Sequence, residues 1–388
     1  MTTVCELNKC AGCMACVDIC PKGAIKIKDS LSAYNAVIDE KKCIGCNVCY
    51  KVCQVNHPTK AKAPINWYQG WIENLETRGE CSSGGVATAI SIGFLKNGGI
   101  VCGCTFNKGK FIFEFAKNKD ELKKFIGSKY VKSNPTGIYK EIKDRLKREE
   151  EVLFIGLPCQ VAALRNFIGS NLSDKLYTID LICHGTPSPR VLDIFFKQYG
   201  LTLSDLKDIK FRVKAKFQIY GDYKGIITKG ISDRYSIAFL NALTYTENCY
   251  SCPYAKRERV SDVTLGDSWG SELAIDEQKK GISLILSQTE KGNELLKLAN
   301  LHSETVDIEK AIANNHQLEY PSFKPTGRDK FFAGLKDRKF NSLVFKQLPK
   351  QCLRQDVKKI LIKLQIIGQG NKLNYGLLVY PLLREGKK

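Results

Sequence analysis

The hydrophobic pattern predicts alternating helices and strands in the middle of the chain. From Cys81 to Phe106, serines and small residues come first, apolar residues at helical spacing follow, and Gly98 and Gly99 precede the apolar run IVCGCTF. This order predicts a loop, a helix, a turn and a strand. Further on, EVLFIGLPCQVAALRNFIG and LYTIDLICHGTPSP each begin with an apolar strand, and a short helical pattern lies between the two strands. The arrangement is typical of a βαβ unit.

The pattern continues less clearly towards the end of the chain. Residues 281–296 are expected to add a strand and a helix to the same domain. Residues 352–367 have apolar side chains at helical spacing with basic ones between them, which predicts an amphipathic helix packed on the core; partner or membrane binding is the alternative. Residues 55–67, rich in Pro, Lys and Ala with little periodicity, are interpreted as a linker.

Composition limits the class of protein. The 388 residues, 43% of them hydrophobic, suffice for one large core or for two or three smaller ones. A signal peptide is not expected, because the N-terminal stretch MTTVCELNKC has no apolar run behind a basic region, and a membrane span is not expected, because eighteen apolar residues nowhere run together. We therefore expect a cytoplasmic protein. The net charge of +20 favours acidic partners or phosphorylated cofactors, unless it reflects only a lysine-rich composition. No dense basic stripe indicates nucleic-acid binding.

The seventeen cysteines indicate metal or redox chemistry, because thiols in a reducing compartment rarely form disulfides. Eight of them form two stretches, KCAGCMACVDICPKG and KCIGCNVCYKVCQVNH, with the same CxxCxxCxxxC spacing. Zinc is the alternative to iron–sulfur clusters, but zinc sites pair two CxxC units and have no use for a third cysteine at that spacing. The spacing therefore favours iron–sulfur clusters.

Residues 1–57 resemble the bacterial two-cluster ferredoxins. In these proteins, three cysteines of one run and the last of the other hold each [4Fe–4S] cluster. The resemblance implies one cluster on Cys10, Cys13, Cys16 and Cys53, and another on Cys43, Cys46, Cys49 and Cys20. Gln54 replaces the proline that the pattern would place after Cys53, and Cys5, outside the pattern, is interpreted as a plain thiol.

Four more cysteines lie beyond this module. Cys159 and Cys183 each follow a strand of the βαβ unit, so the two residues should meet at one edge of a parallel sheet. Cys249 and Cys252 add a CxxC loop. These four residues are candidate ligands of a third cluster; the alternative is two structural cysteines and an isolated redox pair.

Five motifs, in order, resemble the beta-subunit family of coenzyme F420 hydrogenase and F420-dependent dehydrogenases: SSGG, GSKYVKS, GLPCQVAALR, DLICHGTPSP and CYSCPYAKRERVSDVTLGDSWG. With the ferredoxin module, the resemblance covers about residues 1–300. It implies an α+β ferredoxin-like two-cluster module (1–57), a linker (58–67), an α/β flavin-binding domain with a mixed sheet that also carries an iron–sulfur site (68–300), and a mostly helical C-terminal extension (301–388). It also favours the third cluster.

The resemblance implies FAD as a further cofactor. The residues implied to bind it are Ser82, Ser83, Gly84, Gly85, Gly127, Ser128, Lys129, Tyr130 and Asp267. Two residues are candidates for catalysis. Lys129 would place its charge near the flavin ring, unless it is a surface lysine. His184 would donate a proton or a hydrogen bond near a cluster, unless it has no catalytic role.

Two further residues near these motifs have alternative interpretations. Trp269 would close the pocket together with Asp267, unless this segment is only a turn and a core aromatic. Cys81, at a predicted helix start, is interpreted as a buried inert thiol rather than a reactive one.

Iron–sulfur clusters move single electrons whereas a deazaflavin takes a hydride, so a flavin is expected between them. We therefore predict an oxidoreductase that passes electrons between [4Fe–4S] clusters, FAD and an organic acceptor such as coenzyme F420. The alternatives are a ferredoxin-dependent reductase of another substrate, for example in polysaccharide biosynthesis, and an electron-transfer adaptor without catalysis. The expected partners are an electron-donor protein or ferredoxin, hydrogenase or dehydrogenase subunits, and the small-molecule acceptor.

Overall fold

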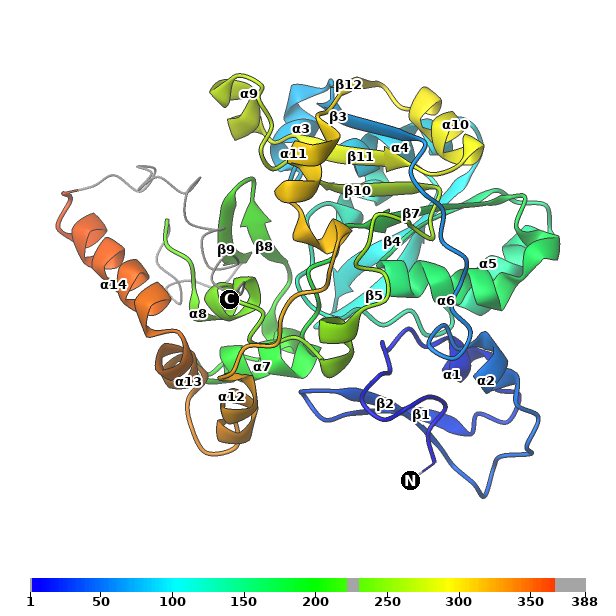
Figure 1. The fold of residues 1–388 in the computed structure, drawn as a ribbon, viewed down its shortest axis with the longest axis horizontal. Helices are drawn as coiled ribbons and strands as arrows, with labels where there is room; N and C mark the ends of the chain where they lie inside the picture. Colours follow the sequence, from blue (N-terminus) through cyan, green and yellow to red (C-terminus); the bar gives the residue numbers. More distant parts are fainter. Residues whose placement is uncertain (1, 222–229, 367–388) are drawn as a thin grey trace.

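The structure, a computed structural model, describes residues 2–221 and 230–366. Its centre is a mixed eight-stranded sheet with the strand order β12-β3-β11-β10-β7-β6-β4-β5 (Figure 1). The strands are β3 (Asn66–Ile72), β4 (Ile100–Asn107), β5 (Lys110–Ala116), β6 (Val152–Ile155), β7 (Leu176–Leu181), β10 (Val263–Asp267), β11 (Ser283–Ser287) and β12 (Leu301–Thr305). The predicted mixed sheet is therefore confirmed.

The middle of the sheet is parallel. Strands β4, β6, β7 and β10 run in one direction, and the helix α6 (Pro158–Ile168) connects β6 to β7. Adjacent parallel strands need such a crossover, so the βαβ prediction is confirmed. The predicted order of loop, helix, turn and strand from Cys81 to Phe106 is also confirmed, with α4 (Val86–Lys96) preceding β4.

Both faces of the sheet are covered by helices. Along β6, Val152 and Phe154 belong to one buried cluster, whereas Leu153 between them belongs to another, as expected for a strand buried on both sides. The cluster of Val152 and Phe154 includes α6 and α5 (Ile138–Lys147). The cluster of Leu153 includes α4 and α10 (Glu290–Leu298).

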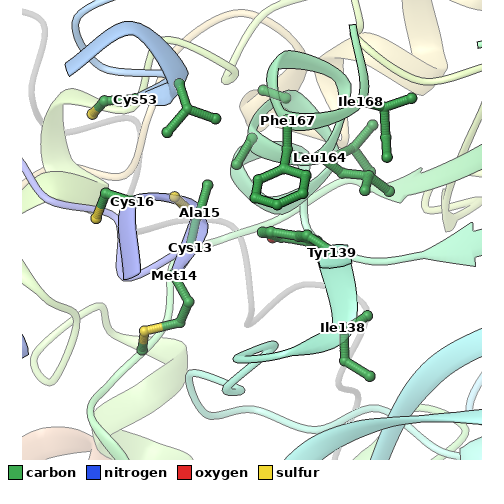
Figure 2. Close-up of a cluster of buried hydrophobic side chains, with 14 of the residues drawn as sticks. Cys13, Met14, Ala15, Cys16, Cys53, Ile138, Tyr139, Leu164, Phe167 and Ile168 are labelled. Atoms are coloured by element: carbon green, nitrogen blue, oxygen red, sulfur yellow. The ribbon is translucent and has the colours of Figure 1, made fainter. Parts of the chain in front are cut away.

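The N-terminal module contains the hairpin β1 (Ile25–Asp29) and β2 (Tyr34–Ile38) and the short helices α1 (Ala15–Ile19) and α2 (Val48–Val52). Its core is continuous with that of the larger domain: Cys13 and Ala15 belong to the same buried cluster as Tyr139 and Phe167 (Figure 2). The backbone N–H of Gly137, before α5, donates to both carboxylate oxygens of the buried Asp18, 2.8 and 3.0 Å away. The module is therefore packed firmly against α5 and α6.

The predicted boundaries differ from the elements in two places. Asn66 and Trp67, assigned to the linker, begin β3, and Lys62 already pairs through its backbone with Arg259. The predicted extension starts at residue 301, but Leu301–Thr305 forms β12 and pairs with β3 at the edge of the large sheet. In the sheet, β3 pairs with both β11 and β12, so these residues satisfy their backbone hydrogen bonds there.

A smaller lobe beside the sheet contains the hairpin β8 (Ile209–Val213) and β9 (Lys216–Gly221) and a set of helices. Those helices are α7 (Pro189–Lys197), α8 (Arg234–Leu240), α12 (Arg328–Gly334), α13 (Phe340–Gln347) and α14 (Pro349–Lys363). Phe195, Phe211 and Phe340 are part of its buried core. The amphipathic helix predicted near the C-terminus corresponds to α14, which buries Cys352 and exposes Leu353 and Val357.

The remaining described helices are α3 (Leu75–Glu80), α9 (Ile275–Lys280) and α11 (Ile308–Ala313). Over residues 2–221 and 230–366, none of the helices has the length and apolar character that crossing a membrane requires.

Candidate iron–sulfur and cofactor sites

Cys10, Cys13, Cys16 and Cys53, called here the first cysteine set, line one cavity in the N-terminal module. All four side chains are buried. The loop between Cys10 and Cys13 turns sharply at Gly12, whose φ of 68° is strained for other residues and whose added Cβ would lie 2.5 Å from a ring carbon of Tyr34. This turn also lets the backbone N–H of Gly12 donate to the Cys10 sulfur, 3.4 Å away.

The other four ferredoxin cysteines, Cys20, Cys43, Cys46 and Cys49, are called the second cysteine set and line a second cavity. Here Cys43 and Cys46 are exposed. The backbone N–H of Ala24 donates to the Cys20 sulfur, 3.3 Å away. The structure therefore brings the eight cysteines together in the crossed grouping that the ferredoxin resemblance implies, with Cys20 and Cys53 exchanged between the two runs.

The chemistry of these cavities fits iron–sulfur clusters. Each is lined by four of the ferredoxin cysteines, and each receives a backbone N–H directed at one of their sulfur atoms, a contact that stabilises thiolate ligands. In the part of the chain that the structure describes, no three or more His, Cys, Asp or Glu side chains are grouped to hold a metal ion directly. The cysteines of the first and second sets instead line two cavities, as ligands of a multi-atom cluster would.

Cys5 is part of the first cavity, although the sequence pattern does not include it. Its thiol hydrogen-bonds with Cys10 and Cys53, and these contacts, followed by burial, raise the pKa of Cys5 far above the usual range. The same contact lowers the pKa of Cys53 to about 6. The position of Cys5 next to two ligand candidates was not apparent from the sequence, because the contact depends on the fold of the loop.

Cys159, Cys183, Cys249 and Cys252, called the third cysteine set, are also neighbours. Burial raises the pKa of Cys183 most, and the nearby Cys249, Cys159 and Cys252 raise it further. Burial and then Cys249 raise the pKa of Cys252 to about 11. The strand-end position of Cys159 and Cys183 and the CxxC loop thus converge, as the sequence hypothesis required.

The three cysteine sets lie one after another in space, in the order second, first, third. The second set adjoins the first, since Cys49 is among the groups that raise the pKa of Cys16 after burial and Cys10. The first adjoins the third, since Cys13 is among the groups that raise the pKa of Cys159 after burial. Tyr254 lies between these last two sets: burial, then Cys159 and Cys13, raise its pKa, and its hydroxyl donates to Gln54.

The segments expected to bind a flavin meet at Arg212, which sequence reasoning missed. Its guanidinium forms two hydrogen bonds with Asp267, of 2.7 and 2.9 Å, donates to the Ser82 carbonyl oxygen at 2.9 Å and to the Tyr130 hydroxyl at 3.2 Å. Burial alone would raise the pKa of Asp267, but the charge and hydrogen bonds of Arg212 outweigh it and hold that pKa below its usual value. Ser128 donates its backbone N–H to the Ser82 hydroxyl at 2.9 Å, which joins the SSGG and GSKY segments directly.

The SSGG turn is pressed against the sheet. A Cβ on Gly84 would lie 2.4 Å from the Gly70 carbonyl oxygen, so only glycine fits. Gly85 has a φ of 81° and precedes α4. Lys214 donates from Nζ to the Ser83 carbonyl oxygen at 3.0 Å, and burial lowers the pKa of Lys214 to about 8.

The GSKY segment begins at Gly127, whose φ is 90°, and continues to Lys129. Lys129 is half-buried, and its Nζ donates to the carbonyl oxygens of Phe125 and Ile126 at 2.8 and 3.2 Å. Burial lowers its pKa. Lys129 is therefore held in place by the chain instead of extending into solvent as a surface lysine would.

His184 has partners that the sequence did not indicate. Its Nδ1 lies 2.8 Å from Nε2 of Gln317, and the same amide nitrogen lies 2.8 Å from Nε2 of His316. Burial, then His316, lower the pKa of His184 to about 4, so the ring is neutral at pH 7. Oε1 of Gln317 and Nδ1 of His316 are buried without a hydrogen-bond partner among the described residues. Asp267 raises and Arg212 lowers the pKa of the same histidine. The side chains of His184, His316 and Gln317 therefore adjoin the Arg212 site.

Trp269 and Cys81, the two residues with alternative interpretations, are also placed by the structure. Trp269 lies under the guanidinium of Arg212, 5.9 Å from the ring centroid, beside the same site. Cys81 is buried, and burial raises its pKa, as expected for an inert thiol. Arg212 itself occupies an ordinary position in the run KFRVK of β8, a pattern that carries no binding signature.

Two family models match separate parts of the chain. Residues 9–57 match the 4Fe-4S dicluster domain, and residues 149–311 match the family described as the C terminus of the coenzyme F420 hydrogenase/dehydrogenase beta subunit. No curated protein matches the chain. Among solved structures, it is similar to a chain of the F420-reducing [NiFe] hydrogenase complex from Methanosarcina barkeri, studied by xenon derivatization; the identity is 17%, the match covers 77% of this chain and 93% of that one, and the TM-score is 0.44.

The protein is thus an oxidoreductase of the iron–sulfur electron-transfer type. Residues 9–57 match the 4Fe-4S dicluster domain, and residues 149–311 of the main domain are similar to the C terminus of the coenzyme F420 hydrogenase/dehydrogenase beta subunit. The family resemblance seen in the sequence motifs is confirmed.

Proposed function

We propose that the protein is an iron–sulfur flavoprotein that connects an electron-donor protein to an organic hydride acceptor. The observation that carries this proposal is the continuity of the three cysteine sets, which leads from an exposed edge to the residues around Arg212. The first and second sets would hold two [4Fe–4S] clusters and the third set a further one. The Arg212 site would hold FAD.

Several features support FAD at this site. Arg212 and Lys214 bring two cations to the SSGG turn, which suits a phosphorylated cofactor. Buried polar atoms of Gln317 and His316 that lack partners among the described residues offer hydrogen bonds to a ligand near His184. When bound, FAD exchanges single electrons for a hydride, the conversion that separates cluster chemistry from a deazaflavin.

The protein's own residues have distinct proposed roles. The residues proposed to bind FAD are those named from the sequence: Ser82, Ser83, Gly84, Gly85, Gly127, Ser128, Lys129, Tyr130 and Asp267. Lys129, fixed by two carbonyl oxygens, supplies positive charge that favours an anionic ring. His184, neutral at pH 7, is a hydrogen-bond donor or acceptor, and Gln317 fixes its ring orientation. Asp267 holds Arg212 in place.

The acceptor is proposed to be coenzyme F420, and the setting the cytoplasm. The test is anaerobic: the ferredoxin-reduced protein is mixed with oxidised coenzyme F420, and loss of the deazaflavin absorbance is followed. Rapid hydride transfer is expected. A Lys129→Ala variant should keep its clusters but bind or reduce FAD less well.

Two other outcomes are informative. If the bound flavin is reduced but F420 is not, the protein is a reductase of another substrate, for example in polysaccharide biosynthesis. If the protein binds no flavin, it is an electron-transfer adaptor for a partner hydrogenase or dehydrogenase.

A further inference from the structure

We infer that the loop of residues 41–47, with Lys22, Tyr50 and Lys51 beside it, is a docking surface for an acidic electron-carrier protein. This inference rests on the proposed function, in which the second cysteine set holds a cluster that receives electrons. We call these residues the entry surface.

The burial of the cysteines identifies where electrons can enter. All four residues of the first set are buried, and Cys249 of the third set is buried as well. In the second set, by contrast, Cys43 and Cys46 are exposed. The other three cysteines of the third set are only partly exposed. Electron transfer between proteins requires a close approach of the two redox centres, so the second set, with two exposed cysteines, is the most accessible of the three to a protein donor.

The entry surface has an apolar centre. Ile44, between the two exposed cysteines, is 60% exposed, and it also lines the cavity of the second set. Tyr50 is 51% exposed. Both side chains leave apolar surface open to solvent, and a partner protein that covered it would gain the burial typical of an interface centre.

The rim of the entry surface is basic. Lys22 lines the same cavity as Ile44, and Lys41, Lys42 and Lys51 are exposed nearby in the chain. Within the ranges that the structure describes, none of these four lysines forms an ion pair with a carboxylate.

Two acidic side chains, Asp39 and Glu40, precede the loop, and both are already engaged; Glu40 accepts a hydrogen bond from the Thr2 hydroxyl. Asp39 accepts hydrogen bonds from the backbone N–H of Lys41, at 3.1 Å, and its carbonyl oxygen accepts from Lys42 and Cys43. These contacts shape the loop, and the Lys41 and Lys42 side chains remain exposed. An apolar centre with a basic rim complements a carrier whose redox centre lies in an acidic surface, and the protein's net charge of +20 adds long-range attraction.

The test uses the full-length protein, reconstituted with iron, sulfide and FAD without oxygen, and an acidic bacterial two-[4Fe–4S] ferredoxin as the probe. Stopped-flow absorbance gives the second-order rate constant for reduction by this ferredoxin. In the Lys41→Glu/Lys42→Glu variant, the rate constant should fall at least about tenfold at low ionic strength. The difference should shrink as salt is added, because salt screens the charges.

The matched control is Lys96→Glu/Lys297→Glu, which makes the same change in net charge on α4 and α10, at the far side of the large sheet from the N-terminal module (Figure 1). It should retain most of the wild-type rate. An Ile44→Ala variant should weaken binding of the oxidised ferredoxin in a calorimetric titration by several-fold, with little change in salt dependence. Iron content and the electron paramagnetic resonance spectrum after dithionite reduction should be unchanged in all variants.

Equal loss of rate in the control and the Lys41/Lys42 variant, or a wild-type rate in the latter, would overturn the entry surface. This outcome differs from failure of the proposed function. If the dithionite-reduced wild-type protein transferred no hydride to any acceptor, the function would change, but the ferredoxin rates would still decide whether the entry surface is correct.

Discussion

The ammonium group of Lys132 donates a hydrogen bond to the carbonyl oxygen of Ala11, 2.9 Å away, and so joins the GSKYVKS segment to the loop that carries Cys10 and Cys13. Lys132 is 3% exposed; on the other side, burial raises the pKa of Cys159, and the charge of Lys132 opposes this rise. A buried cation therefore lies between the first and third cysteine sets.

The first prediction concerns this cation. Reduction adds negative charge to a cluster, and a nearby buried positive charge stabilises the reduced form. Lys132→Met should lower the reduction potential of the first or third cluster by an amount on the order of 50 mV, whereas Lys132→Arg should stay closer to the wild type. Redox titration monitored by electron paramagnetic resonance measures the change. Equal potentials in both variants and the wild type, with full iron content, would show that the charge has no such role.

The second prediction concerns the third cysteine set. Three filled sites should give about twelve iron atoms per chain, and Cys249→Ser/Cys252→Ser should leave about eight. The experiment needs the full chain, because removing the N-terminal module would expose the core that Tyr139 and Phe167 share with Cys13. Iron analysis of anaerobically purified protein provides the count. An unchanged iron content in the variant would mean that these cysteines are structural, and tightly bound zinc with little iron would contradict the clusters altogether.

The third prediction concerns Arg212 and Asp267. In the wild type the pKa of Asp267 is depressed, so the stabilisation from this pair is complete above the unfolded carboxyl pKa of about 3.9 and is lost as the pH falls below it. In Arg212→Met, burial without a cation should instead raise that pKa, so the variant should lose stability as the pH rises from about 5 to 7.5. Anaerobic urea unfolding at the two pH values measures this, and we expect a loss of about 3 kcal/mol near neutrality.

The control for this pair is Arg212→Met/Asp267→Asn, which removes the buried charge as well. It should recover part of the stability and show little dependence on pH in that range. If the single and double variants behaved alike at every pH, the carboxylate of Asp267 would not be the cause of the loss.

The fourth prediction concerns the SSGG turn. Gly84→Ala should destabilise the protein by about 1–3 kcal/mol, because the new Cβ would lie 2.4 Å from the Gly70 carbonyl oxygen and 2.7 Å from the Ser283 nitrogen. The variant should also bind FAD more weakly, as measured by flavin content after purification. Gly79→Ala is the control, since its Cβ would have no heavy atom within 4 Å. Similar stability losses in both variants would show that helix propensity or chain entropy, not crowding at Gly84, determines the effect.

The sequence by itself determined the local features of this protein. The spacing of Cys10, Cys13 and Cys16 places three sulfur atoms around one short loop, and the apolar runs around residues 152 and 176 predict two adjacent parallel strands. Both kinds of signal depend on residues a few positions apart, so the backbone geometry of a single loop or strand is enough to read them. The family motifs likewise follow from short segments in a fixed order.

Only the tertiary structure decided how distant segments meet. It brought Cys249 and Cys252 to the sheet edge beside Cys159 and Cys183, placed β12 at the edge of the sheet rather than in a helical extension, and packed the N-terminal module against α5 and α6. It also selected Arg212, in a strand without any binding motif, as the partner of Asp267. The physical reason is that burial and long-range packing set these contacts: a guanidinium with a buried carboxylate, or a cation between two cysteine sets, has no local pattern that the sequence can reveal.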